Sequence, residues 1–232
     1  MSTPFLTAEW RKLAIANYIV EPSLLLSWLP PKTELDLWNG KCFVSLVGFM
    51  FINTRLKGIK IPFHTNFEEI NLRFYVRHGN KRGVVFIKEI VPSPALSFVA
   101  NTIYKENYET LKTAHSWITS PGTLNVEYRW KKADWNVFRV STEKSPVAIA
   151  EGSEEEFITE HYWGYTKAGA DHSYEYEVTH PRWDVYPVRS YRIDVDFANV
   201  YGKAFGFLSK QKPASVFLAE GSPIAVLGTH KI

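Results

Sequence analysis

Cysteine is nearly absent from this chain of 232 residues, which has only Cys42. A single cysteine excludes an intrachain disulfide, so the apolar core must stabilise the fold. Cys42 lies in the apolar run of residues 41–47, which favours an inert buried thiol, because free cysteine packs as a small hydrophobe. A catalytic thiol needs a neighbouring base and an electropositive setting, and the sequence around Cys42 offers neither.

Long apolar runs are also missing. No run approaches the ~18 residues that a membrane-spanning helix requires. Residues 1–10 lack the basic and then apolar pattern of a secretory signal. The sequence therefore predicts a cytoplasmic protein that does not associate with a membrane.

Neither charge dominates the chain. The 27 lysines and arginines are interspersed with 24 acidic residues, whereas a nucleic-acid-binding surface gathers its basic residues on one face. The sequence also has no His or Cys spacing typical of a metal site, no P-loop, no GxSxG and no GxGxxG before a helix. We therefore expect no nucleic-acid partner, no metal and no cofactor.

Aromatic residues are abundant, at 15% of the chain. Large flat side chains pack well on pleated sheets and also form the walls of ligand cavities. Hydrophobic residues make up 45%, which is enough for a full core, and all-β domains of this length are often single units. We expect residues 1–232 to form one domain.

Short strands separated by turns dominate the hydrophobic pattern. Residues 93–104 have helical spacing, and a second helix is expected at 199–208. Strands and helices do not alternate, so we expect a mainly β fold, a largely antiparallel barrel or sandwich. The expected strands include residues 10–20, 41–52, 66–77, 84–91, 123–130, 135–141 and 173–180, with a final hairpin of 215–219 and 224–228 across Gly221-Ser222.

Residues 67–76 alternate strictly between two kinds of side chain. Alternate residues of a strand lie on one face, so Glu69, Asn71, Arg73 and Tyr75 form a single polar row. This row could line a polar pocket, or it could be the solvated side of an ordinary antiparallel strand. Periodicity alone favours the solvated side.

Several segments, in one order, resemble a known family. They are residues 6–10, Leu29-Pro30, residues 35–37 with Gly40, residues 67–76 and residues 160–162. Together they resemble the uncharacterised bacterial YqjF-like family over nearly the whole chain. That family is similar in fold to acetoacetate decarboxylase. The resemblance implies a cone-like, largely antiparallel β-barrel with an internal cavity, and it makes a homo-oligomer a further expectation.

The resemblance also carries over one site residue. The decarboxylase has a Tyr/Phe-x-Glu motif that puts a carboxylate into its cavity, and residues 67–69 match it, which implies that Glu69 faces the cavity. The decarboxylase also forms a Schiff base with a lysine that has a second cation beside it. Here Tyr108 and Glu109 stand at those two positions, and the nearest lysines are displaced by three and four residues. The resemblance therefore implies the fold but not the imine chemistry.

Six residues form the candidate site. We expect catalytic roles for Glu69, Tyr108 and His161, and ligand binding by Asn71, Arg73 and Tyr75. The histidine is a candidate because an imidazole can donate or accept a proton at about pH 7. The simpler alternative for it is a hydrogen-bonded structural role.

Three functions stay open for this polar row. The first is a binding or sensing protein that holds a small polar ligand, an oxo or carboxylic compound, with the fork of Arg73 on a carboxylate. The second is an enzyme that uses non-imine acid–base chemistry, of lyase or hydratase type, with Glu69 as the acid or base. The third is structural, with Glu69 and Arg73 as a buried pair that only fixes the barrel.

Overall fold

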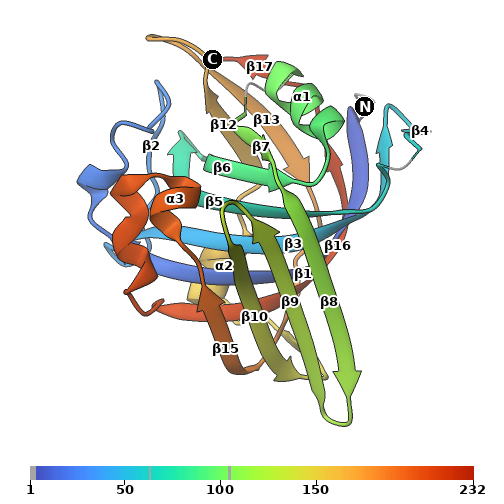
Figure 1. Ribbon diagram of the computed structural model, residues 1–232. Coiled ribbons are helices and arrows are strands. Elements are labelled where there is room, and N and C mark those ends of the chain that lie inside the picture. Colours follow the sequence, from blue (N-terminus) through green and yellow to red (C-terminus); the bar gives the residue numbers. More distant parts are fainter. Residues whose placement is uncertain (1–3, 63, 104–105) are drawn as a thin grey trace.

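A closed barrel forms the centre of the fold in the computed structural model, which describes residues 4–62, 64–103 and 106–232. Seven of the described strands follow one another around it in the order β16, β1, β3, β5, β6, β12 and β13, and β13 pairs back onto β16 (Figure 1). All neighbours are antiparallel except β6 and β12. The expected mainly β, largely antiparallel barrel is therefore confirmed. Its strands are β1 (Leu6–Val20), β3 (Cys42–Leu56), β5 (Phe67–His78), β6 (Lys81–Val91), β12 (Trp163–Lys167), β13 (Ser173–Thr179) and β16 (Ser215–Val226).

A second, four-stranded antiparallel sheet lies across one side of the barrel (Figure 1). Its order is β15 (Val188–Asp194), β10 (Trp135–Glu143), β9 (Thr123–Lys131) and β8 (Lys112–Ser120). Short strands extend the barrel sheet: β2 (Glu34–Leu35), β4 (Ile59–Lys60), β7 (Tyr108–Thr110), β11 (Val147–Ala148), β14 (Asp184–Tyr186) and β17 (His230–Lys231).

Short helices connect the strands. They are α1 (Pro94–Ile103), α2 (Glu154–Thr159) and α3 (Phe197–Tyr201), with 3-10 turns η1 (Pro22–Leu24) and η2 (Lys203–Ser209). The first predicted helix is confirmed over α1, and Tyr104, in its predicted last turn, lies outside the described residues. The second is divided into α3 and η2 at Gly202, where φ is +109°. No helix in the described part of the chain is long and apolar enough to cross a membrane.

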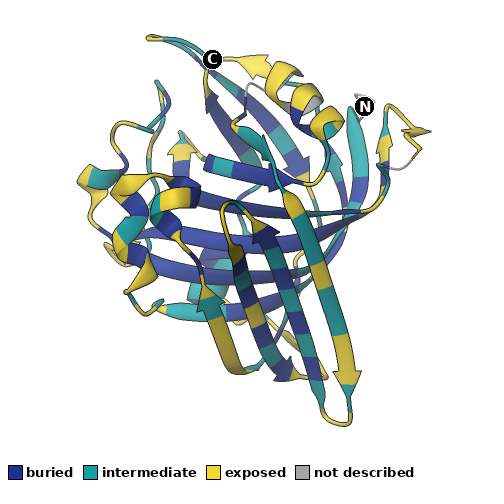
Figure 2. Ribbon diagram, in the orientation of Figure 1, coloured by how far each residue is buried: buried dark blue, intermediate teal, exposed yellow. Residues whose placement is uncertain are grey.

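The alternation of β5 divides its side chains between two cores. Leu72 joins the cluster that includes Val126 of the four-stranded sheet, whereas Tyr75 belongs to the cluster inside the barrel. Both faces of β5 are therefore covered (Figure 2). Glu69 is 3% exposed and Asn71 is 1% exposed, so the interpretation of their face as the solvated side is wrong. The sheet that packs on the outside of β5 leaves only the barrel interior for the polar row.

The predicted C-terminal hairpin is also wrong. β16 runs without a break and pairs with β1 from Leu6 to Asn17. Gly221 has φ +79°, but a Cβ atom there would lie 2.0 Å from the carbonyl oxygen of Trp10 on β1. Glycine at this position allows the close approach of two paired strands instead of making a turn.

Candidate functional site

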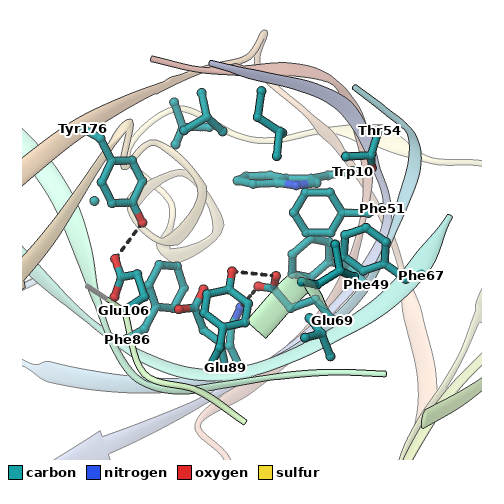
Figure 3. Close-up of a pocket in the computed structure, with 18 of the residues that line it drawn as sticks. Trp10, Phe49, Phe51, Thr54, Phe67, Glu69, Phe86, Glu89, Glu106 and Tyr176 are labelled. Atoms are coloured by element: carbon teal, nitrogen blue, oxygen red, sulfur yellow. Dashed lines mark hydrogen bonds between the residues drawn. The ribbon is translucent and has the colours of Figure 1, made fainter. Parts of the chain in front are cut away.

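The barrel holds a cavity of about 190 Å³, lined by side chains of all seven barrel strands, by β7 and by the start of α1. Figure 3 shows that its wall has two chemically different parts. One part is the carboxyl cluster, formed by Glu69, Glu89 and Glu106. The other is the aromatic end, formed by Trp10, Phe49, Phe51 and Phe67. The cavity therefore suits a ligand that has both polar and apolar parts.

Glu69 is held by two hydrogen bonds inside the cavity. The amide of Asn71 donates to Oε1 at 3.0 Å, and the hydroxyl of Tyr108 donates to Oε2 at 3.1 Å. Burial raises the pKa of Glu69 to about 7, although these two donors and the charge of Arg73 lower it. A carboxyl group with this pKa can both give and take a proton at neutral pH. Tyr108 keeps its own proton, because burial and the nearby charges of Glu69 and Glu89 raise its pKa well above the ordinary value.

Two further glutamates of the cavity were not predicted from the sequence. Glu106 accepts hydrogen bonds from Thr166 at 2.7 Å and from Tyr176 at 2.9 Å, both at Oε1. Burial, followed by the charge of Glu69, raises the pKa of Glu106 to about 7. Glu89 is 2% exposed, and burial together with its two acidic neighbours raises its pKa well above the ordinary range. Burial therefore favours the protonated form of Glu89, which can donate a hydrogen bond.

A register shift between β5 and β6 explains why alternation did not find Glu89. Strict alternation from Phe86 would place Lys88 on the inner face of β6. The pairing shifts by one residue between Leu72↔Lys88 and Arg73↔Phe86, so beyond the shift the odd-numbered residues face inward. Glu89 then lines the cavity, and Lys88 donates to Glu109 at 2.8 Å. Only the paired strands reveal this change of face.

Arg73 is a buried cation at the cavity wall, with 8% of its surface exposed. Within the described part of the chain no carboxylate lies within 4.0 Å of its guanidinium, and its Nε has no hydrogen-bond partner. Its charge still lowers the pKa of Glu69 and of Glu89. Glu69 and Arg73 therefore share the cavity without forming a direct ion pair.

His161 lines the cavity, whereas Tyr75 packs behind it. The Nε2 atom of His161 lies 3.0 Å from Asp36, which also accepts from Arg82 at 2.7 Å. Nδ1 is buried and has no partner in the described part of the chain. Burial lowers the pKa of His161 to about 4, so the ring is neutral at pH 7. Tyr75 is absent from the described cavity lining; its hydroxyl lies 2.7 Å from Ser45, and its ring lies 4.7 Å from the imidazole.

No lysine is among the described residues that line the cavity. The ammonium of Lys112 lies 5.8 Å from the ring of Trp135 on the four-stranded sheet, and Lys105 lies outside the described residues. Tyr108 lines the cavity at the position where the resemblance places a lysine. The described residues include no group of three His, Cys, Asp or Glu side chains that could hold a metal ion.

This barrel with an internal cavity has the fold of the acetoacetate decarboxylase-like proteins. The TM-score to acetoacetate decarboxylase from Legionella pneumophila is 0.67 at 14% identity, over 100% of this chain and 88% of that one. For an acetoacetate decarboxylase-like enzyme from Sphingomonas wittichii RW1 the TM-score is 0.67 at 10% identity, over 98% of this chain and 92% of that one. For the enduracididine biosynthesis enzyme MppR, complexed with pyruvate, the TM-score is 0.69 at 11% identity, over 100% of this chain and 91% of that one. At these identities the likeness shows the fold alone.

The sequence itself identifies the family. A family model described as an uncharacterized conserved protein, DUF2071, matches residues 7–223, so the chain belongs to this family. The uncharacterized protein YqjF of Bacillus subtilis (strain 168) is 36% identical over 78 residues. That match spans 33% of this chain and 32% of YqjF, about a third of each. The predicted YqjF-like membership and decarboxylase-like fold are confirmed.

Proposed function

We propose that this protein binds a small oxo or carboxylic compound in the barrel cavity, with Arg73 as the group that pairs with the ligand's carboxylate. The observation that supports it is the state of Arg73, which is a buried guanidinium without an ion-pair partner among the described residues. An uncompensated buried charge destabilises a protein. A bound carboxylate would pair with the fork through two parallel hydrogen bonds.

The protonation of the carboxyl cluster decides which ligand charge the cavity favours. Burial favours the protonated form of Glu89, and the pKa values of Glu69 and Glu106 are about 7. Below neutral pH the carboxyl cluster is mainly protonated, so the guanidinium of Arg73 is the main charge beside it and attracts an anion. In its protonated form, Glu89 can donate a further hydrogen bond to the anion.

The properties of a protein with the same fold agree with this proposal. MppR was solved in complex with pyruvate, a small oxo acid, and that observation belongs to MppR alone. The cavity of about 190 Å³ is larger than pyruvate needs, because a cavity of about 150 Å³ already holds benzene. A small oxo acid is therefore a suitable first probe.

Isothermal titration calorimetry with pyruvate at about pH 6 tests the proposal. We expect the wild type to bind, Arg73→Met to lose at least tenfold in affinity, and Arg73→Lys, which keeps the charge but not the fork, to fall between them. The matched control is Arg77→Met, because Arg77 lies at the exposed end of the same strand. Binding by Arg73→Met with wild-type affinity would contradict the proposal.

A second candidate function is acid–base catalysis without an imine. The contact between Tyr108 and Glu69, at 3.1 Å, joins a carboxyl group with a pKa of about 7 to a phenol at the cavity wall. Glu69 would take a proton from the carbon next to a carbonyl group. Tyr108, or His161 through its unpartnered Nδ1, would serve as the proton partner.

Proton exchange separates catalysis from binding. In D₂O, the methyl protons of pyruvate should exchange in the presence of the wild type, as followed by NMR, and Glu69→Gln should abolish this exchange while pyruvate still binds. Undiminished exchange by Glu69→Gln would refute this role, and Glu151→Gln, on an exposed turn, is the control. Borohydride reduction in the presence of pyruvate should leave the protein mass unchanged, because the described lining contains no lysine.

A further inference from the structure

The cavity wall holds two acceptor atoms that lack a donor among the described residues. They are Oδ1 of Asn71 and Oε2 of Glu89, and both atoms are buried. Asn71 is 1% exposed and Glu89 is 2% exposed, and both residues line the cavity. The amide nitrogen of Asn71 donates to Glu69, which leaves Oδ1 as the end of the amide that can accept from a ligand. Buried acceptors of this kind are a place for an N–H group.

Strand register brings these residues together. Asn71 on β5 pairs with Glu89 on β6. Directly opposed residues of an antiparallel pair have Cβ atoms about 4.5–5.5 Å apart. Glu69 lies two residues before Asn71 on the same face of β5 and accepts its hydrogen bond at 3.0 Å. The amide oxygen of Asn71 and the carboxyl groups of Glu69 and Glu89 therefore form one part of the wall, which we call the acceptor patch.

The charged groups of the cavity are unequal in number. The described lining has three glutamates, one arginine and no lysine, and Figure 3 shows the glutamates along the same side of the cavity. Burial first, and then the charges of Glu106 and Glu69, raise the pKa of Glu89, so the carboxyl groups oppose one another's ionisation. A ligand with only a carboxylate would add a further negative charge. A ligand that also carries a cation would offset this repulsion.

Arg73 lies next to the acceptor patch. It is two residues after Asn71 on the same face of β5, so the two levels are about 7 Å apart along the strand. This separation is comparable to the length of an arginine side chain. The charge of Arg73 also lowers the pKa of both Glu69 and Glu89, which indicates that the guanidinium lies near their carboxyl groups. One small ligand can therefore contact the patch and Arg73 together.

We propose that the ligand is a small amino acid whose ammonium group binds at the acceptor patch and whose carboxylate binds at Arg73. An ammonium group has three N–H donors, which match the oxygens of Asn71, Glu89 and Glu69. The cavity of about 190 Å³ has room for such a molecule, because a cavity of about 150 Å³ already holds benzene. The inference rests on the proposed function, since the carboxylate is placed at Arg73.

Titration calorimetry at about pH 7.5 with matched pairs of probes tests the ammonium site. The pairs are alanine and β-alanine, each against propionate, and 4-aminobutyrate against butyrate, so the members of a pair differ only in the amino group. We expect at least one amino acid to bind at least about tenfold more tightly than its partner, because hydrogen bonds from an ion are about twice as strong as neutral ones. The series also varies the distance between ammonium and carboxylate.

Glu89→Gln tests the acceptor patch, because it keeps the shape of the side chain and removes its charge. The variant should bind the preferred amino acid at least about tenfold more weakly, whereas its affinity for the partner without the amino group should not fall. It should fold, since it replaces a buried acid by a neutral amide. The matched control is Glu151→Gln, which makes the same change on an exposed turn and should alter neither affinity.

A pH series on the wild type tests the same contact without a substitution. An ammonium group favours the ionised form of a neighbouring carboxyl group, so the preference for the amino acid over its partner should grow between pH 6 and 8. Tyr108 keeps its proton and His161 stays neutral over this range, so the carboxyl groups carry the change. The charged and titratable groups around the patch are Glu69, Arg73, Glu89, Glu106, Tyr108, His161 and Tyr176.

The outcomes separate this inference from the proposed function. If propionate or pyruvate binds through Arg73 and no amino acid is preferred, the inference alone is overturned. A preference that Glu89→Gln leaves intact, or that stays constant from pH 6 to 8, would overturn it as well. An amino acid that binds Arg73→Met as tightly as the wild type would overturn the proposed function and keep the ammonium site. The absence of binding by every probe would overturn both.

Discussion

Replacing Glu106 by glutamine should make the protein more stable at alkaline pH. Thr166 and Tyr176 both donate to the same oxygen, Oε1, so the amide oxygen of glutamine can accept both hydrogen bonds. The shape of the side chain is also unchanged. The substitution therefore removes an ionisable group from the cavity wall and leaves its contacts in place.

The pKa of Glu106 gives the sign and the size of the effect. Its pKa rises from an ordinary value of 4.5 to about 7 on folding, because burial and then the charge of Glu69 disfavour the carboxylate. Between these two values the folded state holds a proton that the unfolded state has lost, so stability falls as pH rises from about 4.5 through about 7. Each pKa unit corresponds to about 1.4 kcal/mol, so at about pH 9 the penalty is about 3 kcal/mol. The Glu106→Gln variant should lack this penalty at pH 9, and its free energy of unfolding should differ little from that of the wild type at about pH 4.5.

Urea denaturation at pH 5, 7 and 9 measures this difference. The free energy of unfolding gained through Glu106→Gln should grow with pH. In thermal unfolding at pH 9, the substitution should raise the melting temperature by roughly 6–12 °C in a chain of this size. Glu151→Gln, on an exposed turn, should change stability by less than about 0.5 kcal/mol at every pH. A difference in the free energy of unfolding between Glu106→Gln and the wild type that stays constant with pH would refute the reasoning. Glu106 would then have the same pKa in the folded and unfolded states.

Three more predictions concern the cavity and the core. In titration calorimetry, the affinity for pyruvate should fall about tenfold per pH unit above about pH 7, because the ionised carboxyl cluster then competes with the ligand for Arg73. An affinity that does not change with pH would show that the cluster does not titrate in this range. Gly164→Ala should destabilise the protein by about 1–3 kcal/mol in urea, because its Cβ would lie 2.1 Å from Cζ of Tyr176; an unchanged midpoint would contradict this close contact between β12 and β13. Leu72→Ala, between the two sheets, should lower the free energy of unfolding by about 2–5 kcal/mol, whereas Leu26→Ala, at a 60% exposed position, should change it little. Equal losses of stability in the two variants would contradict this packing.

Local pattern was sufficient to predict part of this site. Strict alternation in β5 puts Glu69, Asn71 and Arg73 on one face whatever surrounds the strand, because the period of two is a property of the extended backbone. The excess of aromatic residues and the lack of strand–helix alternation were likewise enough to predict a mainly β fold. The family resemblance added the cavity, and with it the position of Tyr108.

The rest of the site depends on contacts between segments that are distant in sequence. Whether the polar row faced water or a cavity was decided by the four-stranded sheet, which covers the other face of β5. Closure of the barrel came from the pairing of β13 with β16, which also made β16 one strand instead of a hairpin. Glu89 entered the cavity through a register shift, and Glu106 through the connection before β7. Tyr75, on the predicted face, ended behind His161 and outside the described lining. The sequence by itself determined the faces of single strands, because alternation is local; tertiary structure alone decided which faces meet, because register and closure depend on strand pairing across the whole chain.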